Sequence, residues 1–156
     1  MAEKIAILFV CTGNICRSPT AEGVLAALAR DAGIAIEWDS AGISGCHVGE
    51  APDPRAQKAA ARRGYDLSQL RARKLEGADF RRFDLILAMD RGHLDEMKRR
   101  CPEALQDRVH LFLDYLPGRE GGEIPDPYYG GEAGFEHVLD LCEDAGAALL
   151  RRLTQR

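Results

Sequence analysis

Short continuous apolar runs alternate along this chain with longer stretches in which apolar residues recur every three or four positions. The first run, at 4–10, contains Ile, Phe and Val and is short enough for a strand covered on both faces. Three further runs, at 34–39, 83–89 and 109–113, predict strands of the same kind. The four runs together indicate a parallel sheet buried between helices.

Helical spacing marks the stretches between these strands. Amphipathic helices are expected at 19–32, 53–63 and about 91–100. Ser18 suits the N-cap of the first of these helices and Pro19 suits its first helical position. A long closing helix is marked by the apolar residues Phe135, Val138, Leu139, Cys142, Ala145, Leu149 and Leu153.

The alternation of strands and helices favours an α/β fold, a three-layer sandwich around a four-stranded parallel sheet. No repeat or linker divides the chain, so a single domain spanning 1–156 is expected. Ligands in such folds bind at the carboxyl ends of the strands. The segment 11–18, which follows the first strand, is therefore the expected binding loop. A second long loop, at 116–131, contains three prolines and five glycines.

Composition narrows the class of protein without identifying it. Hydrophobic residues make up 46% of the chain and charged residues 29%, which are ordinary globular values. The net charge of −4 gives no basic footprint for nucleic acid. The apolar run at 5–10 is too short to span a membrane, and no cleaved signal is recognisable. A cytoplasmic protein without a membrane partner is expected.

Five cysteines with irregular spacing argue against a disulfide framework, because their number is odd. No cysteine or histidine pair has the spacing of zinc ligands, so no metal site is expected. The cysteines are of interest instead as thiols, and one of them ends the first strand.

The segment 11–18 reads Cys, five residues, Arg, Ser, between a strand and a helix. The amides of such a loop and the helix N-terminus form a cradle for an anion. Gly13 allows close backbone approach or an unusual dihedral, and Asn14 tolerates the left-handed region. Arg17 can grip two phosphate oxygens with its planar fork. A nucleotide-binding loop of the Gly-x4-Gly-Lys type is excluded because the segment lacks lysine.

A cysteine in this cradle experiences the same positive field, which favours the nucleophilic thiolate. Attack by Cys11 on a bound phosphate ester would give a thiophosphate intermediate, and Ser18 is placed to donate a hydrogen bond to the sulfur. The competing interpretation is that Cys11 is a small buried residue and Arg17 a surface charge.

The expected general acid lies far along the chain, in the sequence IPDPYYG at 124–130. Prolines on both sides stiffen the backbone of Asp126, and Tyr128 and Tyr129 can form an aromatic wall for a flat ring. An acid at this position would protonate the leaving oxygen of the ester. The alternative is that this segment is an ordinary turn.

The chain resembles the low-molecular-weight protein tyrosine phosphatases over nearly its whole length. The resemblance rests on CTGNICRSP at 11–19, SAG at 40–42 followed by HVG at 47–49, APDPRA at 51–56, AMD at 88–90 and DPYYG at 126–130. It implies hydrolysis of phosphotyrosine without a metal or other cofactor. It also implies tyrosine-phosphorylated proteins as partners, with a bacterial-type tyrosine kinase as one candidate. The protein itself is expected to be a monomer or a weak dimer.

The resemblance assigns Cys11 as nucleophile, Arg17 as phosphate clamp and Asp126 as general acid. Asn14, Ser18 and Ser40 resemble the residues that hold the loop in shape. Cys16 matches a second loop cysteine that can form a reversible disulfide with the nucleophile, although simple packing explains it equally well. The residues expected to contact substrate or phosphate, besides Arg17, are Thr12, Gly13, Asn14, Ile15, Cys16, Ser18, Cys46, Tyr128 and Tyr129.

Two positions depart from the pattern of that family. Cys46 stands where an aromatic wall residue is often found, which should open the pocket. Leu70, within SQLRAR at 68–73, stands where many members have a histidine that supports the loop asparagine. Since leucine cannot hydrogen-bond, we expect Asn14 to depend more on Ser40 or on water.

Three other functions fit the same scaffold less well. A protein-arginine phosphatase resembles this loop but carries threonine where this chain has Ile15. An arsenate reductase needs two further cysteines near the third strand, where only Cys101 is found. A phosphoprotein-binding module without turnover would lack the nucleophile, the arginine or the acid, and all three are present.

Overall fold

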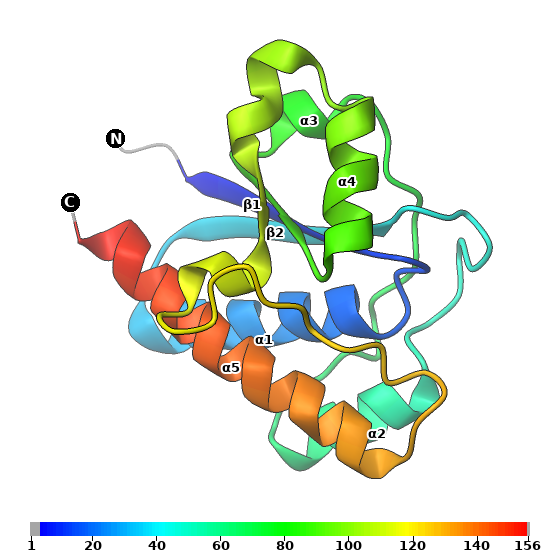
Figure 1. The fold of residues 1–156 in the computed structure, drawn as a ribbon. Helices are drawn as coiled ribbons and strands as arrows, with labels where there is room; N and C mark the ends of the chain where they lie inside the picture. The colour runs from blue at the N-terminus through cyan, green and yellow to red at the C-terminus, as the bar shows by residue number, and fades with distance from the viewer. Residues whose placement is uncertain (1–3, 156) are drawn as a thin grey trace.

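The computed structural model describes residues 4–155, so the ends of the predicted domain, 1–3 and 156, lie outside the described residues. Its sheet has four parallel strands: β1 (Ile5–Cys11), β2 (Ile36–Gly42), β3 (Leu85–Ala88) and β4 (Val109–Leu111). Their order in the sheet is β2-β1-β3-β4 (Figure 1). The four predicted strands are confirmed, with ends shifted by up to three residues because short strands stop where the ladder stops.

The sheet is covered on both faces, as the continuous apolar runs predict (Figure 1). One side carries α1 (Arg17–Ala32), α2 (Pro54–Arg62) and α5 (Glu132–Thr154). The other side carries α3 (Asp79–Arg82) and α4 (Arg91–Arg100). The fold is therefore the expected three-layer α/β sandwich.

The alternation of side chains along β1 explains how one strand serves two cores. Ile7 and Phe9 belong to the cluster shared with α1 and α5, whereas Leu8 and Val10 belong to the cluster shared with α4. All four side chains are 0% exposed. Successive residues of a strand point to opposite faces, so only a run without polar residues can be buried on both. This anchoring fixes the end of β1, where Cys11 lies.

The prediction that Ser18 caps the first helix is wrong. α1 begins at Arg17, two residues before Pro19, and its N-cap is Cys16, which makes no side-chain capping bond. The Ser18 hydroxyl is instead 2.9 Å from the Cys11 sulfur and 2.8 Å from the Asn14 amide nitrogen. Pro19 is tolerated at the third helical position because the first amides of a helix have no intrahelical partner.

The remaining boundaries follow local chemistry closely. Asp53 caps α2 by accepting a hydrogen bond from the Arg55 amide, and α4 has the predicted bounds. Three short helical segments were not expected from the apolar pattern: α3 and the 3-10 helices η1 (Glu103–Arg108) and η2 (Phe112–Tyr115). They are too short for helical periodicity to be recognised. None of the helices within 4–155 combines the length and apolar character needed to cross a bilayer.

Candidate active site

The loop from Cys11 to Arg17 turns between β1 and α1 at the carboxyl edge of the sheet. Asn14 has a φ of 59°, the only positive φ of a non-glycine residue within 4–155. A Cβ at Gly13 would lie 2.8 Å from Cδ2 of His47, so glycine lets the His47 ring approach the loop this closely. The loop is thus shaped by the two residues whose backbone chemistry the sequence singled out.

The Cys11 thiol lies at the bottom of this loop and is 3% exposed. Its sulfur is 2.9 Å from the Ser18 hydroxyl oxygen. Ser18 in turn accepts a hydrogen bond from Nδ2 of Asn14 at 2.8 Å, and the same nitrogen donates to Ser40 at 2.9 Å. The side chains of Asn14, Ser18 and Ser40 therefore lie behind the loop as a buried support.

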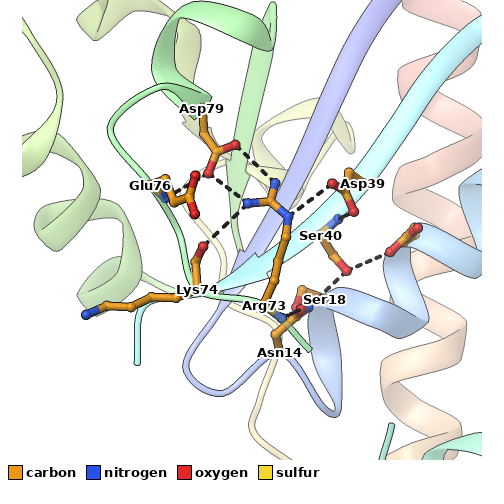
Figure 2. A network of polar contacts seen from close by, with 9 residues as sticks. Asn14, Ser18, Asp39, Ser40, Arg73, Lys74, Glu76 and Asp79 are labelled. Atoms are coloured by element: carbon orange, nitrogen blue, oxygen red, sulfur yellow. Dashed lines mark hydrogen bonds and ion pairs between the residues drawn. The ribbon is translucent and has the colours of Figure 1, made fainter. Parts of the chain in front are cut away.

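The support of Asn14 is completed by a residue that the sequence did not indicate. The Arg73 amide donates to Oδ1 of Asn14 at 3.0 Å, and Figure 2 shows the two residues side by side. The Arg73 guanidinium is held by Asp39 and Asp79. Asn14 does bond Ser40, as expected from Leu70, and a backbone amide supplies the other contact.

Arg17 is buried beside the loop, with 3% exposure. Its Nη1 donates to Oδ2 of Asp90 at 2.9 Å and to the Ile124 carbonyl at 3.0 Å. Its Nη2 lies 3.7 Å from Oδ2 of Asp126. One half of the guanidinium is thus fixed, and the other half faces the candidate acid.

Asp90 connects Arg17 to the start of α4. Its Oδ1 accepts the His93 amide at 2.9 Å. Burial opposes ionisation of Asp90, but the hydrogen bond from the His93 amide and the Arg17 guanidinium outweigh it, so the pKa of Asp90 lies below the usual range. His93 is 7% exposed, and its Nε2 lies 2.7 Å from the Thr12 hydroxyl. Burial lowers the pKa of His93 to about 4, so the ring is neutral at pH 7.

Asp126 stands at the mouth of the loop, with 46% of its side chain exposed. The segment is anchored by Ile124, which is fully buried and whose amide donates to the Met89 carbonyl at 2.8 Å. The Tyr128 amide donates to Oδ1 of Asp126 at 3.0 Å. The rings of Tyr128 and Tyr129 meet edge to face at 5.0 Å, which gives the aromatic wall its shape.

These residues enclose one pocket of about 220 Å³. Its lining contains Cys11, Arg17 and Asp126, although the acid is more than 100 residues from the loop in sequence. Ser44 and His47 also line it and were not singled out in the sequence. The other lining residues are Thr12, Gly13, Ile15, Cys16, Cys46, Tyr128 and Tyr129.

The two further thiols of the pocket differ in environment. Cys16 is buried, and its burial together with nearby Asp53 raises its pKa to about 12, so it is a neutral thiol. Cys46 is exposed and accepts a hydrogen bond from the Ser44 hydroxyl at 2.8 Å. All five cysteines are free thiols in this structure, and a disulfide between Cys11 and Cys16 stays a prediction.

Sequence reasoning missed the residues that back the loop from a distance. Asp90 could have been found, because an aspartate directly before a predicted helix is a typical N-cap. The roles of Arg73 and His93 carry no local signal, since Asn14 and Thr12, which they contact, are far away in the sequence. Within residues 4–155, no three side chains of His, Cys, Asp or Glu are grouped as ligands for a metal ion.

Comparison with known proteins gives the same assignment along the whole fold. Residues 6–156 match the family model described as low molecular weight phosphotyrosine protein phosphatase. A low molecular weight protein-tyrosine-phosphatase of Streptomyces coelicolor is 44% identical over 155 residues, covering 96% of this chain and 94% of the relative. The low molecular weight phosphotyrosine protein phosphatase of Homo sapiens is 39% identical over 158 residues, covering 97% and 99%.

A solved structure shares the fold closely. The protein tyrosine phosphatase from Entamoeba histolytica, crystallised with Hepes in the active site, superimposes with a TM-score of 0.92. It is 39% identical in sequence, and the match covers 96% of this chain and 97% of that one.

Proposed function

The chain belongs to the low molecular weight phosphotyrosine protein phosphatase family, and on this premise we propose that it hydrolyses phosphotyrosine through a phosphocysteine intermediate. The observation that carries the proposal is the meeting of Cys11, Arg17 and Asp126 in one pocket. A nucleophile, an anion clamp and an acid in one site are the three groups that this reaction needs. We assign the catalytic domain to the whole chain, 1–156.

In the first step, Arg17 and the loop amides hold the phosphate, and the thiolate of Cys11 attacks phosphorus. An S–P bond forms while the bond from phosphorus to the tyrosine oxygen breaks. Asp126 gives its proton to the leaving oxygen, which departs as a neutral phenol. The Nη2 of Arg17, 3.7 Å from Asp126, lies on the side of the guanidinium that would face the phosphate.

In the second step, the Asp126 carboxylate takes a proton from water as the water oxygen attacks phosphorus. The S–P bond breaks, inorganic phosphate is released and the Cys11 thiolate returns. The Ser18 hydroxyl, 2.9 Å from the sulfur, stabilises the negative charge that develops on it. The two steps consume one water and leave the chain unchanged.

The shape of the pocket supports an aryl phosphate as substrate. Tyr128 and Tyr129 provide a wall for a flat ring, and Ile15 adds an apolar branched side chain that suits a phenyl group better than a guanidinium. The proposed partners are tyrosine-phosphorylated proteins, a bacterial-type tyrosine kinase among them. We propose that this protein acts on them as a monomer or a weak dimer. Catalysis by a free thiol suits a reducing compartment, so we propose a cytoplasmic location.

The test is an assay of the purified chain with chelator present, on p-nitrophenyl phosphate, a phosphotyrosine peptide, a phosphoserine peptide and phosphoarginine. Hydrolysis of the two aryl substrates is expected, and Cys11→Ser should abolish it while still binding inorganic phosphate. Cys142→Ser, which changes a buried cysteine of α5, is the matched control and should keep its activity.

Other outcomes would replace the proposal. Preference for phosphoarginine would indicate an arginine phosphatase, in which Cys46 rather than Ile15 determines the substrate selectivity of the pocket. Thiol-dependent turnover of arsenate without ester hydrolysis would indicate an arsenate reductase. Phosphate binding without any turnover would indicate a binding module.

A further inference from the structure

A carboxyl group outside the pocket ends the hydrogen-bond chain that supports the catalytic loop. Glu22, on the second turn of α1, is 7% exposed. Its Oε1 accepts a hydrogen bond from the Ser40 hydroxyl at 2.6 Å, a length typical of a bond to a charged acceptor. The mechanism above does not use this group, and burying a carboxylate carries a cost that packing alone does not require.

Figure 2 draws the hydrogen bonds that join Asn14 to its neighbours, and the donor of each bond in this network can be assigned. The Arg73 amide donates to Oδ1 of Asn14, which identifies Oδ1 as the acceptor end of this side-chain amide and Nδ2 as its donor end. Its Nδ2 then donates to both Ser40 and Ser18. Ser40 has one proton and gives it to Glu22, so its oxygen remains open to accept from Asn14.

The proton of Ser18, at the Cys11 end of this hydrogen-bond network, can be assigned in the same way. Ser18 accepts one hydrogen bond from Asn14, so its own proton is left for the Cys11 sulfur at 2.9 Å. Each N–H or O–H proton in this hydrogen-bond network thus has one acceptor, and the network ends at two acceptors, the Glu22 carboxylate and the Cys11 sulfur. A neutral Glu22 could donate to Ser40, whose proton would then lose its acceptor.

We propose that Glu22 is a positioning residue for catalysis: as the terminal acceptor behind Ser40, its carboxylate orients Asn14 and thereby aims the Ser18 hydroxyl at the Cys11 sulfur. The inference rests on the proposed phosphatase function. The step it affects is the second one, in which Ser18 stabilises the departing thiolate.

The surroundings of Glu22 place its ionisation in the physiological range. Burial raises its pKa to about 7, against the lowering effect of the Ser40 hydrogen bond. Asp39, on β2, raises the pKa further, and Arg73 lowers it. The Arg73 guanidinium is shared between Asp39 and Asp79, so it only partly compensates the charge of Glu22. Above about pH 7 Glu22 should therefore be ionised and accept the Ser40 proton, and below that pH this orienting contact should be lost.

The experiment compares wild type with Glu22→Gln on p-nitrophenyl phosphate at pH 8 and pH 5.5. At pH 8 the variant should have a kcat about three- to tenfold lower, the range for one weakened hydrogen bond. At pH 5.5, where the wild-type carboxyl is protonated, the two kcat values should converge. Inhibition by inorganic phosphate should change less than about twofold, because the weakened bond does not form the cradle.

Glu143→Gln is the matched control, since Glu143 is a partly buried carboxyl that hydrogen-bonds Tyr65 and Arg63 away from the loop. Its kcat ratio to wild type should be the same at both pH values. In a Ser18→Ala background, Glu22→Gln should have no further effect, because the two residues act through one chain. If Glu22→Gln does not fold, Ser40→Ala tests the same link and should show the same pH-dependent loss.

Several results would overturn the proposal. One is a constant kcat ratio between wild type and Glu22→Gln from pH 5.5 to 8. Another is a double variant, Glu22→Gln with Ser18→Ala, whose loss in kcat equals the product of the two single losses. Parallel weakening of phosphate inhibition would show a collapsed loop rather than a positioning effect. These failures leave the proposed function intact as long as wild type hydrolyses aryl phosphates and Cys11→Ser does not. An inactive wild type would overturn both.

Discussion

The acid of the proposed mechanism is the residue whose position is least protected by burial. Asp126 has a side chain 46% exposed, whereas Cys11 and Arg17 are each 3% exposed. Its place is set by its neighbours, because Ile124 is anchored to Met89 and the Tyr128 amide holds one carboxyl oxygen. A side chain held in this way can be changed without disturbing the fold.

Asp126→Asn should therefore act on chemistry and not on stability. We expect kcat/KM for phenyl phosphate, which reports the first step and whose phenolate is a poor leaving group, to fall roughly 10²- to 10⁴-fold, the usual contribution of a general acid. The loss should be smaller on p-nitrophenyl phosphate, whose phenolate leaves without a proton. Steady-state kinetics on both substrates checks this, and equal losses on the two would argue against Asp126 as the acid.

At the scale of elements, the loop is held by the end of a neighbouring strand. The Ile43 and Ser44 amides, just past β2, donate to the carbonyls of Cys11 and Thr12, each at 2.9 Å. A Cβ at Gly42 would lie 3.0 Å from backbone atoms of Gly13, Thr12 and Ser44. The parallel pairing of β2 with β1 thus sets the space in which the loop turns.

Gly42→Ala should push this strand end away from the loop. Because the contacts are with backbone atoms, which cannot move aside like a flexible side chain, we expect a loss of about 1–3 kcal/mol in the free energy of unfolding. Inhibition by inorganic phosphate should weaken in parallel. Gly77→Ala is the control, since a Cβ there meets nothing within 4 Å. Urea unfolding of both variants gives the comparison, and equal stabilities would show that the strand end yields easily.

At the scale of the whole molecule, the buried histidine next to the loop couples stability to pH. His93 has a pKa lowered to about 4, whereas an unfolded histidine titrates near its ordinary value of 6.5. Below pH 6.5 the unfolded chain therefore binds a proton that the folded chain does not. The contribution of His93 to stability is present above pH 6.5 and is lost as the pH falls toward 4.

His93→Gln should remove this loss. Between pH 7 and pH 4.5 the wild type should lose roughly 2–3 kcal/mol more free energy of unfolding than the variant does. His137→Gln, at an exposed position of α5, should follow the wild type. Urea unfolding at the two pH values measures the difference. A variant that loses stability in parallel with the wild type would mean that the burial of neutral His93 does not contribute.

The prediction that Ser18 caps the first helix failed for a physical reason. Ser18 has the residue type and position of an N-cap, but its hydroxyl is bonded to Cys11 and Asn14 instead. Capping preference describes what a side chain does when only its own helix competes for it. At the loop, two stronger partners compete, and the helix begins earlier without a side-chain cap.

The sequence by itself determined the four parallel strands and the position of the loop, because the burial of a strand and the chemistry of the loop each depend on residues that are consecutive in the sequence. Cys11, Arg17 and Asn14 could be singled out for the same reason. Only the tertiary structure decided what lies behind them. Arg73 is 59 residues from Asn14, and Asp90 is 73 residues from Arg17. Contacts at such separations depend on how strands and helices pack in space, which periodicity along the chain does not record.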